Sequence, residues 1–350
     1  MTSLLLSFGV AAFLISFFAT VFVRFVATKW HIVDHPHHPK NIHTHPIPRL
    51  GGVAIFFAVA IMVIVSLLFS KWLVSGSIQY TQYIGFLIGG FVLMIGGYID
   101  DRFDLPPKFA IMAPLVASIV VIAFGVNIEK LTNPFGGVIY LSHLQSDAIV
   151  FVWLMIVMYT TKFLDGLDGL ATSVTSIGSL MVLLLALTIA YFQPDVALIA
   201  AIVLGAELGF LFWNFHPASI FLGEGGSTLV GYLIGMLAVI SGGKLATALL
   251  VLGVPLLDVC WIVLRRFRAG GFKQIFVGDR KHLHHRLLDR GWSQTQIVLF
   301  YVFVSGLFGV STLFLQSKEK VIALFLLAGL MLIAVAFFVK KENRYPQSGR

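Results

Sequence analysis

The chain has 350 residues, of which 58% are hydrophobic and only 11% are charged, and its mean hydropathy is +0.95. An average soluble protein is about 25% charged, so the composition excludes soluble, disordered and collagen-like classes and predicts an integral membrane protein. Each spanning helix needs about 20 apolar residues, so the length has room for roughly ten or eleven spans. The single cysteine, Cys260, excludes an internal disulfide.

The apolar runs predict an all-α polytopic membrane protein with eleven transmembrane helices. The runs lie near 3–25, 51–70, 82–99, 109–126, 147–164, 173–192, 196–213, 227–242, 245–264, 295–316 and 321–339. A ten-span alternative merges the short eighth run with the ninth and reverses the side of the C-terminus. We expect one integral-membrane domain over 1–340, a short tail over 341–350, and a small hairpin within the loop 127–146.

The basic residues set the expected orientation. Of the 24 Lys and Arg residues, all but five lie on the odd-numbered connections or the tail; the five are Lys71, Lys130, Lys244, Lys318 and Lys320. The positive-inside rule then places these connections and the C-terminus in the cytoplasm and the N-terminus outside.

The histidines and most acids share this side, which predicts a polar catalytic or binding site there. Ten of the 11 histidines lie on the odd-numbered connections, His143 being the exception. Topology and attraction to anionic lipid headgroups account for the net charge of +8. No basic module stands free of the membrane, so nucleic acid is not an expected partner.

The first odd-numbered connection is rich in proline and histidine and ends at Gly51-Gly52. Its prolines keep the backbone extended. Lys40, His43 and Arg49 could meet an anionic substrate. The alternative is a histidine run that is solvated or binds metal adventitiously.

The second connection carries Asp100 and Asp101 at the end of the third predicted helix. The helix macrodipole disfavours anions at that position, so the pair predicts a partner cation such as Mg²⁺, which prefers oxygen ligands. Asp104 precedes Leu-Pro-Pro, and we expect it to be the N-cap of the fourth helix.

The third and fourth connections add three more acids. Asp165 and Asp168 are each followed by glycine and would share a face if their segment is helical; a plain Asx-turn is the alternative. Glu224 lies among glycines just before Ser227, which we expect to cap the eighth span and expose its N–H groups to a phosphate. A tight glycine turn is the alternative there.

The fifth connection, residues 265–294, contains several arginines and a histidine cluster. As a helix it would place His282, His285 and Arg286 on one face, which suits a diphosphate. A zinc site is the competing interpretation, but the short histidine spacing and the absence of thiols disfavour it.

Taken in order, these segments resemble the polyprenyl-phosphate N-acetylhexosamine-1-phosphate transferase family over nearly the whole chain. The matching stretches are Lys40-x-x-His43, Pro46-x-Pro48-Arg49-x-Gly51-Gly52, Asp100-Asp101, Asp165-Gly-x-Asp168-Gly-Leu-Ala171, Asn214-Phe-x-Pro217-Ala-x-Ile-Phe-x-Gly223 and His282-Leu-His284-His285. The last resembles the branch that starts O-antigen, teichoic-acid and related glycans. A three-histidine run marks the peptidoglycan branch, whose phospho-MurNAc-pentapeptide transfer is the alternative.

The resemblance implies transfer of a HexNAc-1-phosphate, expected to be GlcNAc-1-phosphate, from a UDP-HexNAc donor to undecaprenyl or another polyprenyl phosphate. UMP would be released and a lipid-linked cell-envelope glycan begun. It further implies Mg²⁺ as the cofactor, with Mn²⁺ as a substitute. The site would lie at the cytoplasmic face of the inner (plasma) membrane, in contact with membrane lipids. A homodimer is one oligomeric state to test.

The resemblance also assigns roles to individual residues. The catalytic candidates are Asp100, Asp101, Asp168 and His284. The substrate-binding candidates are Lys40, His43, Arg49, Lys162, Asn214, His282, His285 and Arg286. The metal candidates are Asp165, Asp168 and Glu224.

Several positions depart from the family's pattern, which usually has Asp at Glu224, Asn at Lys162 and Tyr159, Arg-Lys at Lys40-Asn41 and Lys at His45. A charged ammonium group cannot ligate Mg²⁺, so we expect either that Lys162 contacts phosphate directly or that the metal sits closer to Glu224. The rival from another class is a transporter or lipid flippase, which would use acids near the bilayer midplane. Glu207 is the one acid well inside a predicted span, and we expect it to pair with polar groups in the bundle.

Overall fold

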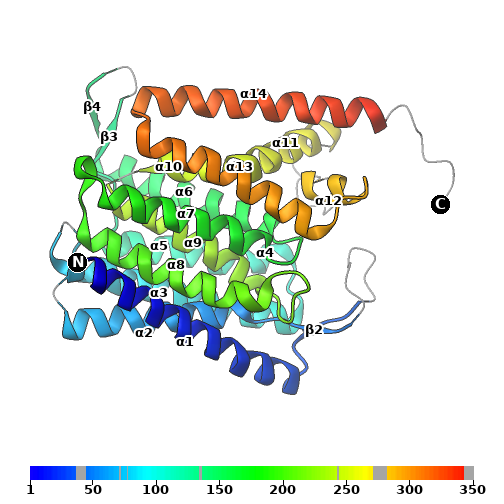
Figure 1. Cartoon of the computed structure of the whole chain (residues 1–350), viewed down its shortest axis with the longest axis horizontal. Coiled ribbons are helices and arrows are strands. Elements are labelled where there is room, and N and C mark those ends of the chain that lie inside the picture. The colour runs from blue at the N-terminus through cyan, green and yellow to red at the C-terminus, as the bar shows by residue number, and fades with distance from the viewer. Residues whose placement is uncertain are drawn as a thin grey trace.

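A computed structural model describes residues 1–36, 45–70, 72–76, 78–133, 136–242, 244–270 and 282–342, with backbone alone for 269–270 and 331–342. Long helices lie side by side, and the chain runs back and forth between the two ends of the bundle (Figure 1). The first half contains α1 Thr2–Lys29, β1 Val33–Asp34, β2 Ile47–Pro48, α2 Gly51–Phe69, η1 Trp72–Val74, α3 Tyr80–Phe103, α4 Pro107–Ala110, α5 Met112–Ala123, β3 Lys130–Thr132, β4 Val138–Tyr140 and α6 His143–Leu164. The second half contains α7 Leu170–Leu187, η2 Ile189–Tyr191, α8 Pro194–Asn214, α9 Gly223–Ile240, α10 Leu245–Val251, α11 Gly253–Gly270, α12 Leu283–Leu288, α13 Gln294–Phe314 and α14 Ser317–Glu342.

Every predicted apolar run coincides with a helix or a pair of helices. Within the described residues, eight helices are long and apolar enough to cross a membrane, namely α1, α2, α3, α6, α7, α8, α9 and α13. The bent pair α10 and α11 would make a ninth. The helices confirm a polytopic membrane protein, whereas the count of eleven spans and their orientation stay predictions.

The span predicted over 245–264 is not one continuous helix, because α10 and α11 meet at an angle of 80°. Leu252 separates the two helices, and Pro255 lies in the first turn of α11. A proline cannot donate its backbone N–H to the preceding turn, and its ring clashes with the carbonyl four residues earlier. The break therefore has a local cause that the sequence already contained.

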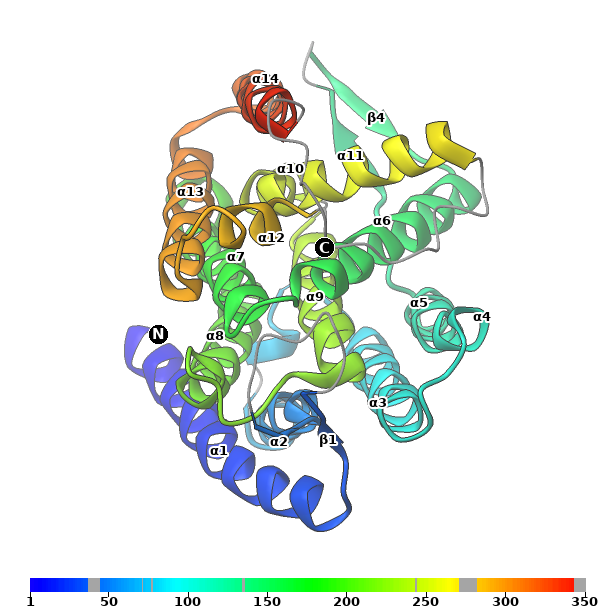
Figure 2. The same cartoon turned by 90° about the vertical axis from the view of Figure 1, so that its right-hand side faces the viewer.

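The two ends of the bundle carry different connections. The hairpin predicted within 127–146 is confirmed, since β3 and β4 pair antiparallel with Leu131 opposite Ile139, and it lies at the same end as the N-terminus (Figure 1). The small β1–β2 ribbon, α4 and α12 lie at the opposite end, which faces the viewer in Figure 2. The odd-numbered connections thus gather at one end of the molecule.

Helix α9 forms the centre of the bundle and is buried from Gly225 to Val239. It packs against α2, α3, α6, α7 and α8, as Figure 2 shows end-on. Glycines bring its first turn unusually close to two neighbours: a Cβ on Gly97 of α3 would lie 2.1 Å from the Cα of Gly225, and a Cβ on Gly52 of α2 would lie 2.2 Å from the Cα of Gly226. The start of α9 is therefore fixed by backbone-to-backbone packing.

Two predicted helix caps are wrong. Asp104 ends α3 with a left-handed φ of 46°, and α4 begins after Pro106 without a side-chain cap. Ser227 lies inside α9, whose first residue is Gly223, and its Oγ donates to the carbonyl of Glu224 at 3.1 Å.

The internal acid Glu207 has the partner expected of a structural residue. The Ser179 hydroxyl of α7 donates to Glu207 Oε2 of α8 at 2.8 Å, and both side chains are buried. This confirms the predicted pairing within the bundle.

Candidate active site

A cavity of about 1310 Å³ opens among α3, α6, α9 and α11, at the end of the bundle that carries the β1–β2 ribbon and α12. One part of its wall, the acidic wall, carries seven carboxylates, from Asp34, Asp100, Asp101, Asp104, Asp165, Asp168 and Glu224. The rest is largely apolar and includes Trp153, Ile156, Leu249, Leu256 and Val263. Ligand pockets are commonly about 300–1,000 Å³, so this cavity is large enough for a charged group together with an apolar chain.

Arg49 forms the outer edge of the acidic wall. Its guanidinium contacts Asp34 Oδ1 at 2.5 Å, Asp104 Oδ1 at 3.6 Å and Asp101 Oδ1 at 4.0 Å. Burial alone would lower the pKa of Arg49, but these carboxylates, Asp34 foremost, outweigh burial and raise it. Arg49 therefore remains a fixed positive charge. Lys40 and His43, expected on the same connection, lie outside the described residues.

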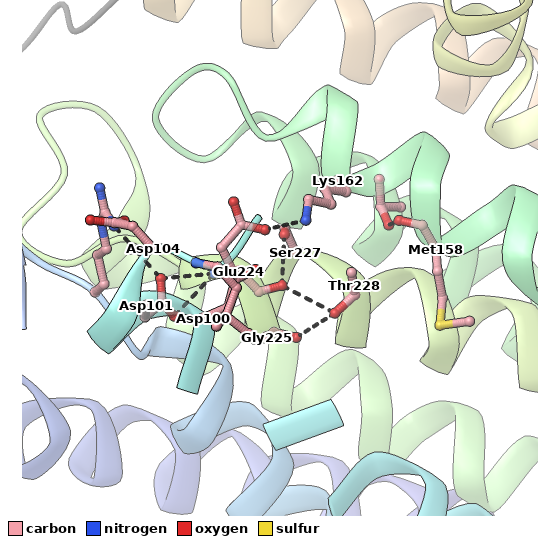
Figure 3. A network of polar contacts seen from close by, with 12 residues as sticks. Asp100, Asp101, Asp104, Met158, Lys162, Glu224, Gly225, Ser227 and Thr228 are labelled. Atoms are coloured by element: carbon pink, nitrogen blue, oxygen red, sulfur yellow. Dashed lines mark hydrogen bonds and ion pairs between the residues drawn. The ribbon is translucent and has the colours of Figure 1, made fainter. Parts of the chain in front are cut away.

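The two acids at the end of α3 have different environments. Both oxygens of Asp101 accept from the backbone N–H of Glu224, at 3.1 and 3.2 Å (Figure 3). Asp100 accepts from the Leu105 N–H through Oδ1 at 2.9 Å, and no other hydrogen bond to its carboxylate occurs among the described residues. Asp101 thus stabilises the positive N-terminus of α9, while Asp100 keeps one carboxylate oxygen for a ligand.

Gly223 leaves the space that the Asp101 carboxylate needs to contact the start of α9. It has a φ of +78°, and a Cβ there would lie 2.5 Å from Asp101 Oδ2 and 3.0 Å from the Leu50 nitrogen. A side chain at this position would therefore be strained and would also displace the carboxylate.

Lys162 and Glu224 form an ion pair inside the cavity. Lys162 Nζ lies 2.5 Å from Glu224 Oε2, and in Figure 3 the two side chains point toward each other from the end of α6 and the start of α9. The two charged side chains are 23% and 40% exposed, so the pair remains reachable from the cavity. The predicted metal candidate Glu224 therefore already has a cationic partner within the chain.

Asp165 and Asp168 both line the cavity, but on a turn between α6 and α7 and not on one helix face. Asp168 Oδ2 contacts His216 Nδ1 at 2.7 Å and accepts from the Ala218 N–H at 3.1 Å. It therefore fixes the connection between α8 and α9. His216 was not among the residues predicted from the sequence. Its position next to Pro217, which matches the family's pattern, could have identified it.

The Asp165 carboxylate lies among other acids on the turn between α6 and α7. Burial and the nearby charges of Glu224, Asp101 and Asp168 raise its pKa to about 8. Within the part of the chain that the structure describes, no hydrogen bond stabilises this carboxylate. A bound cation would remove the repulsion and lower the pKa.

Asn214 is almost fully buried and its amide is occupied on both sides. Thr172 donates to its Oδ1 and its Nδ2 donates to the Ile220 carbonyl, each at 3.0 Å. These contacts hold the loop that leads to Glu224. Asn214 also lines the cavity.

The histidine cluster packs against the turn that carries Asp165. His282 and His285 line the cavity, whereas His284 is 1% exposed and lies behind Gly166, whose Cβ would be 2.5 Å from His284 Nε2. Burial and the neighbouring histidines lower the pKa of His284 well below its usual value, so its imidazole is neutral. Arg286, another candidate on α12, is buried and does not line the cavity.

Asp258 positions this cluster and was missed by the sequence-based candidates. Its carboxylate contacts His282 Nδ1 at 2.8 Å and accepts from the Leu283 N–H at 3.0 Å, which joins α11 to the start of α12. Asp258 is 5% exposed and lies within the predicted span 245–264, so the expectation that Glu207 is the one acid well inside a span was wrong. A carboxylate within an apolar run usually marks a functional residue, so the sequence could have identified Asp258.

The residues fit a divalent cation only in part. No group of three His, Cys, Asp or Glu side chains in the described chain is arranged to hold a metal ion. Mg²⁺ is, however, commonly held by one or two carboxylates plus substrate phosphates. Asp165, together with the second oxygen of Asp168, could supply that smaller set of oxygen ligands.

Comparisons with known proteins show the family to which the chain belongs. The model of glycosyl transferase family 4 matches residues 83–242. A decaprenyl-phosphate N-acetylglucosaminephosphotransferase of Mycobacterium tuberculosis is 31% identical over 366 aligned positions, which cover 96% of this chain and 89% of the relative. A probable undecaprenyl-phosphate N-acetylglucosaminyl 1-phosphate transferase of Bacillus subtilis is 29% identical over 328 positions, covering 91% and 88%. An undecaprenyl-phosphate alpha-N-acetylglucosaminyl 1-phosphate transferase of Escherichia coli O157:H7 is 27% identical over 376 positions, covering 96% and 94%. Since the similarity extends along nearly the whole of both chains, this protein belongs to glycosyl transferase family 4.

Proposed function

We propose that this protein transfers GlcNAc-1-phosphate from UDP-GlcNAc to a polyprenyl phosphate and releases UMP. The observation that carries the proposal is the cavity itself, which joins a wall of carboxylates and cations to an apolar wall between α6, α10 and α11. The names of the relatives supply the substrate class: a polyprenyl phosphate acceptor and an N-acetylglucosamine phosphate group.

The shape of the cavity suits the two substrates. The apolar wall would receive the first isoprene units of the acceptor, whose phosphate would then lie at the acidic and basic wall. The nucleotide sugar is water-soluble and would enter from the end of the bundle where α12 and the β1–β2 ribbon lie. We place that end at the cytoplasmic face, because the basic residues gather on these connections.

In the reaction, an oxygen of the acceptor phosphate attacks the sugar-linked phosphorus of the donor. A new P–O–P bond forms, the bond to the bridging oxygen breaks, and UMP leaves with that oxygen. Two anionic substrates repel each other, so catalysis needs fixed positive charge and accurate alignment. Lys162 would supply the positive charge, while Asp100, whose second oxygen is available, would accept a proton from the acceptor phosphate when it arrives protonated.

The other residues hold these groups in place. Asp101 fixes the start of α9 and Asp168 fixes the loop before it. His282 and His285 face the cavity and would donate to the donor diphosphate or sugar. We further propose that Asp165 and Asp168 would hold Mg²⁺ or Mn²⁺, which when bound supplies charge neutralisation at the diphosphate.

The test is product formation by the purified protein in detergent. It would be incubated with undecaprenyl phosphate, Mg²⁺ and, separately, UDP-GlcNAc, UDP-GalNAc or UDP-MurNAc-pentapeptide, and UMP and lipid product would be measured. We expect UMP with UDP-GlcNAc, its loss in Asp100→Asn, and its retention in Asp147→Asn, whose carboxyl lies at the start of α6 near the hairpin. A folded protein that releases no UMP from any donor would overturn the proposal. Preference for the pentapeptide donor would favour the peptidoglycan step instead.

A further inference from the structure

Lys162 is the cation closest to Glu224 in the described structure. It lies in the last turn of α6, with its ammonium on Glu224 Oε2 and 6.0 Å from the centre of the Tyr159 ring. Asp100 also attracts it electrostatically. The ammonium thus stands within the acidic wall and not at its edge (Figure 3).

Rigid packing holds both members of the pair. Next to Lys162, Thr161 is fully buried, and a Cβ on Gly231 of α9 would lie 2.2 Å from its Oγ1. Glu224 is held at the other side because its backbone N–H donates to Asp101. The ion pair therefore joins two helices whose backbones are already held in close contact.

The distribution of charge shows what Lys162 does. On the outer side of the wall, Arg49 already compensates Asp34, Asp101 and Asp104. On the inner side, Lys162 compensates Glu224 and Asp100. A protonated amine has no lone pair for a metal and repels a divalent cation, so a metal ion at either oxygen of Glu224 would lie beside the positive charge of Lys162.

We propose that Lys162 is a built-in cation that occupies Glu224 and excludes divalent metal from that carboxylate. Metal then binds only on the Asp165 side of the cavity, and weakly until substrate phosphates complete its ligands. The inference deepens the proposed function, since it concerns the cofactor of the same site. It predicts that a metal position at Glu224 exists in this chain but is filled by the protein itself.

The experiment measures Mn²⁺ binding to the substrate-free protein in detergent, by the loss of the free-ion electron paramagnetic resonance signal. We expect Lys162→Met to bind Mn²⁺ at least 10-fold more tightly than the wild type. The double variant Lys162→Met/Glu224→Gln should return to the wild-type affinity. Lys108→Met is the matched control and should change nothing, because Lys108 lies on α4 against the Phe109 ring and does not line the cavity.

A second measurement does not depend on whether Lys162→Met folds. In the wild-type background, Glu224→Gln should leave Mn²⁺ affinity unchanged, because Glu224 is not a ligand while Lys162 holds it. Lys162→Arg keeps the charge and should keep the weak binding.

Three results would overturn the inference: a loss of 10-fold or more in Glu224→Gln alone, no gain in folded Lys162→Met, or a gain that survives the second substitution. Because no substrate is present, these outcomes are independent of whether the protein releases UMP.

Discussion

The close approach of α3 and α9 at Gly97 makes the sharpest structural prediction. A Cβ on Gly97 would lie 2.1 Å from the Cα of Gly225 and 2.4 Å from its nitrogen, both backbone atoms that no side-chain rotation can move. Ordinary contact begins near 3.4 Å, so Gly97→Ala must separate the helices by about 1 Å, a displacement that can cost roughly 100-fold in rate. Overpacking costs about 1–3 kcal/mol, while alanine in place of glycine returns at most about 1 kcal/mol of helix propensity.

We therefore expect Gly97→Ala to lower the thermal unfolding midpoint and to reduce UMP release by about 100-fold, since Asp101 on α3 would move away from the Glu224 N–H. Both would be measured on one detergent preparation, with unfolding followed by intrinsic fluorescence. Gly306→Ala is the matched control, because nothing lies within 4 Å of a Cβ on that α13 glycine; it should keep its activity and be slightly stabilised. A Gly97→Ala protein with wild-type midpoint and turnover would refute the packing argument.

Three further predictions concern the carboxylates and the histidine cluster. Asp165 has a folded-state pKa of about 8 against an ordinary value of 3.8, so the folded state holds the extra proton between these values and wild-type stability falls as pH rises through that window. The midpoint of Asp165→Asn relative to wild type should accordingly increase from pH 5 to pH 8 and then level off in metal-free buffer; a constant difference would contradict the raised pKa. Asp258→Asn removes a charged partner of His282, a hydrogen bond worth about 1.5–3 kcal/mol, and should raise the KM for UDP-GlcNAc about 10-fold or more with a smaller effect on kcat; an unchanged KM would count against the positioning role. Gly166→Ala would press a Cβ against buried His284 and should lower the unfolding midpoint, whereas the double variant with His284→Ala should lose less than the sum of the two single changes in a double-mutant cycle.

The membrane class and the gathering of the site followed from local signals. Apolar runs located the helices, and the one-sided basic residues and acids predicted that distant connections share one end of the bundle. The hairpin and the internal partner of Glu207 were also predictable. Turn residues restrict the backbone to a few conformations, and a buried carboxylate needs a polar partner.

The contacts that shape the site were not predictable in the same way. Asp104 resembled an N-cap because two prolines follow it, yet the chain uses it to end α3. Asp101 caps α9, a helix 123 residues away in sequence, and only tertiary packing through glycines makes that contact. The Lys162–Glu224 pair likewise depends on how α6 meets α9, which a local pattern does not report.

The central claim concerns which phosphorus moves, and a labelled donor tests it most directly. UDP-GlcNAc carrying ³²P in the sugar-linked phosphate would be incubated with the protein and undecaprenyl phosphate, and the products would be partitioned between organic and aqueous phases. The account predicts that the label enters the organic phase as a lipid diphosphate while unlabelled UMP appears in equal amount, and that Asp100→Asn abolishes both. Label that stays in aqueous UDP while the sugar alone moves to lipid, or no transfer by folded protein, would contradict it.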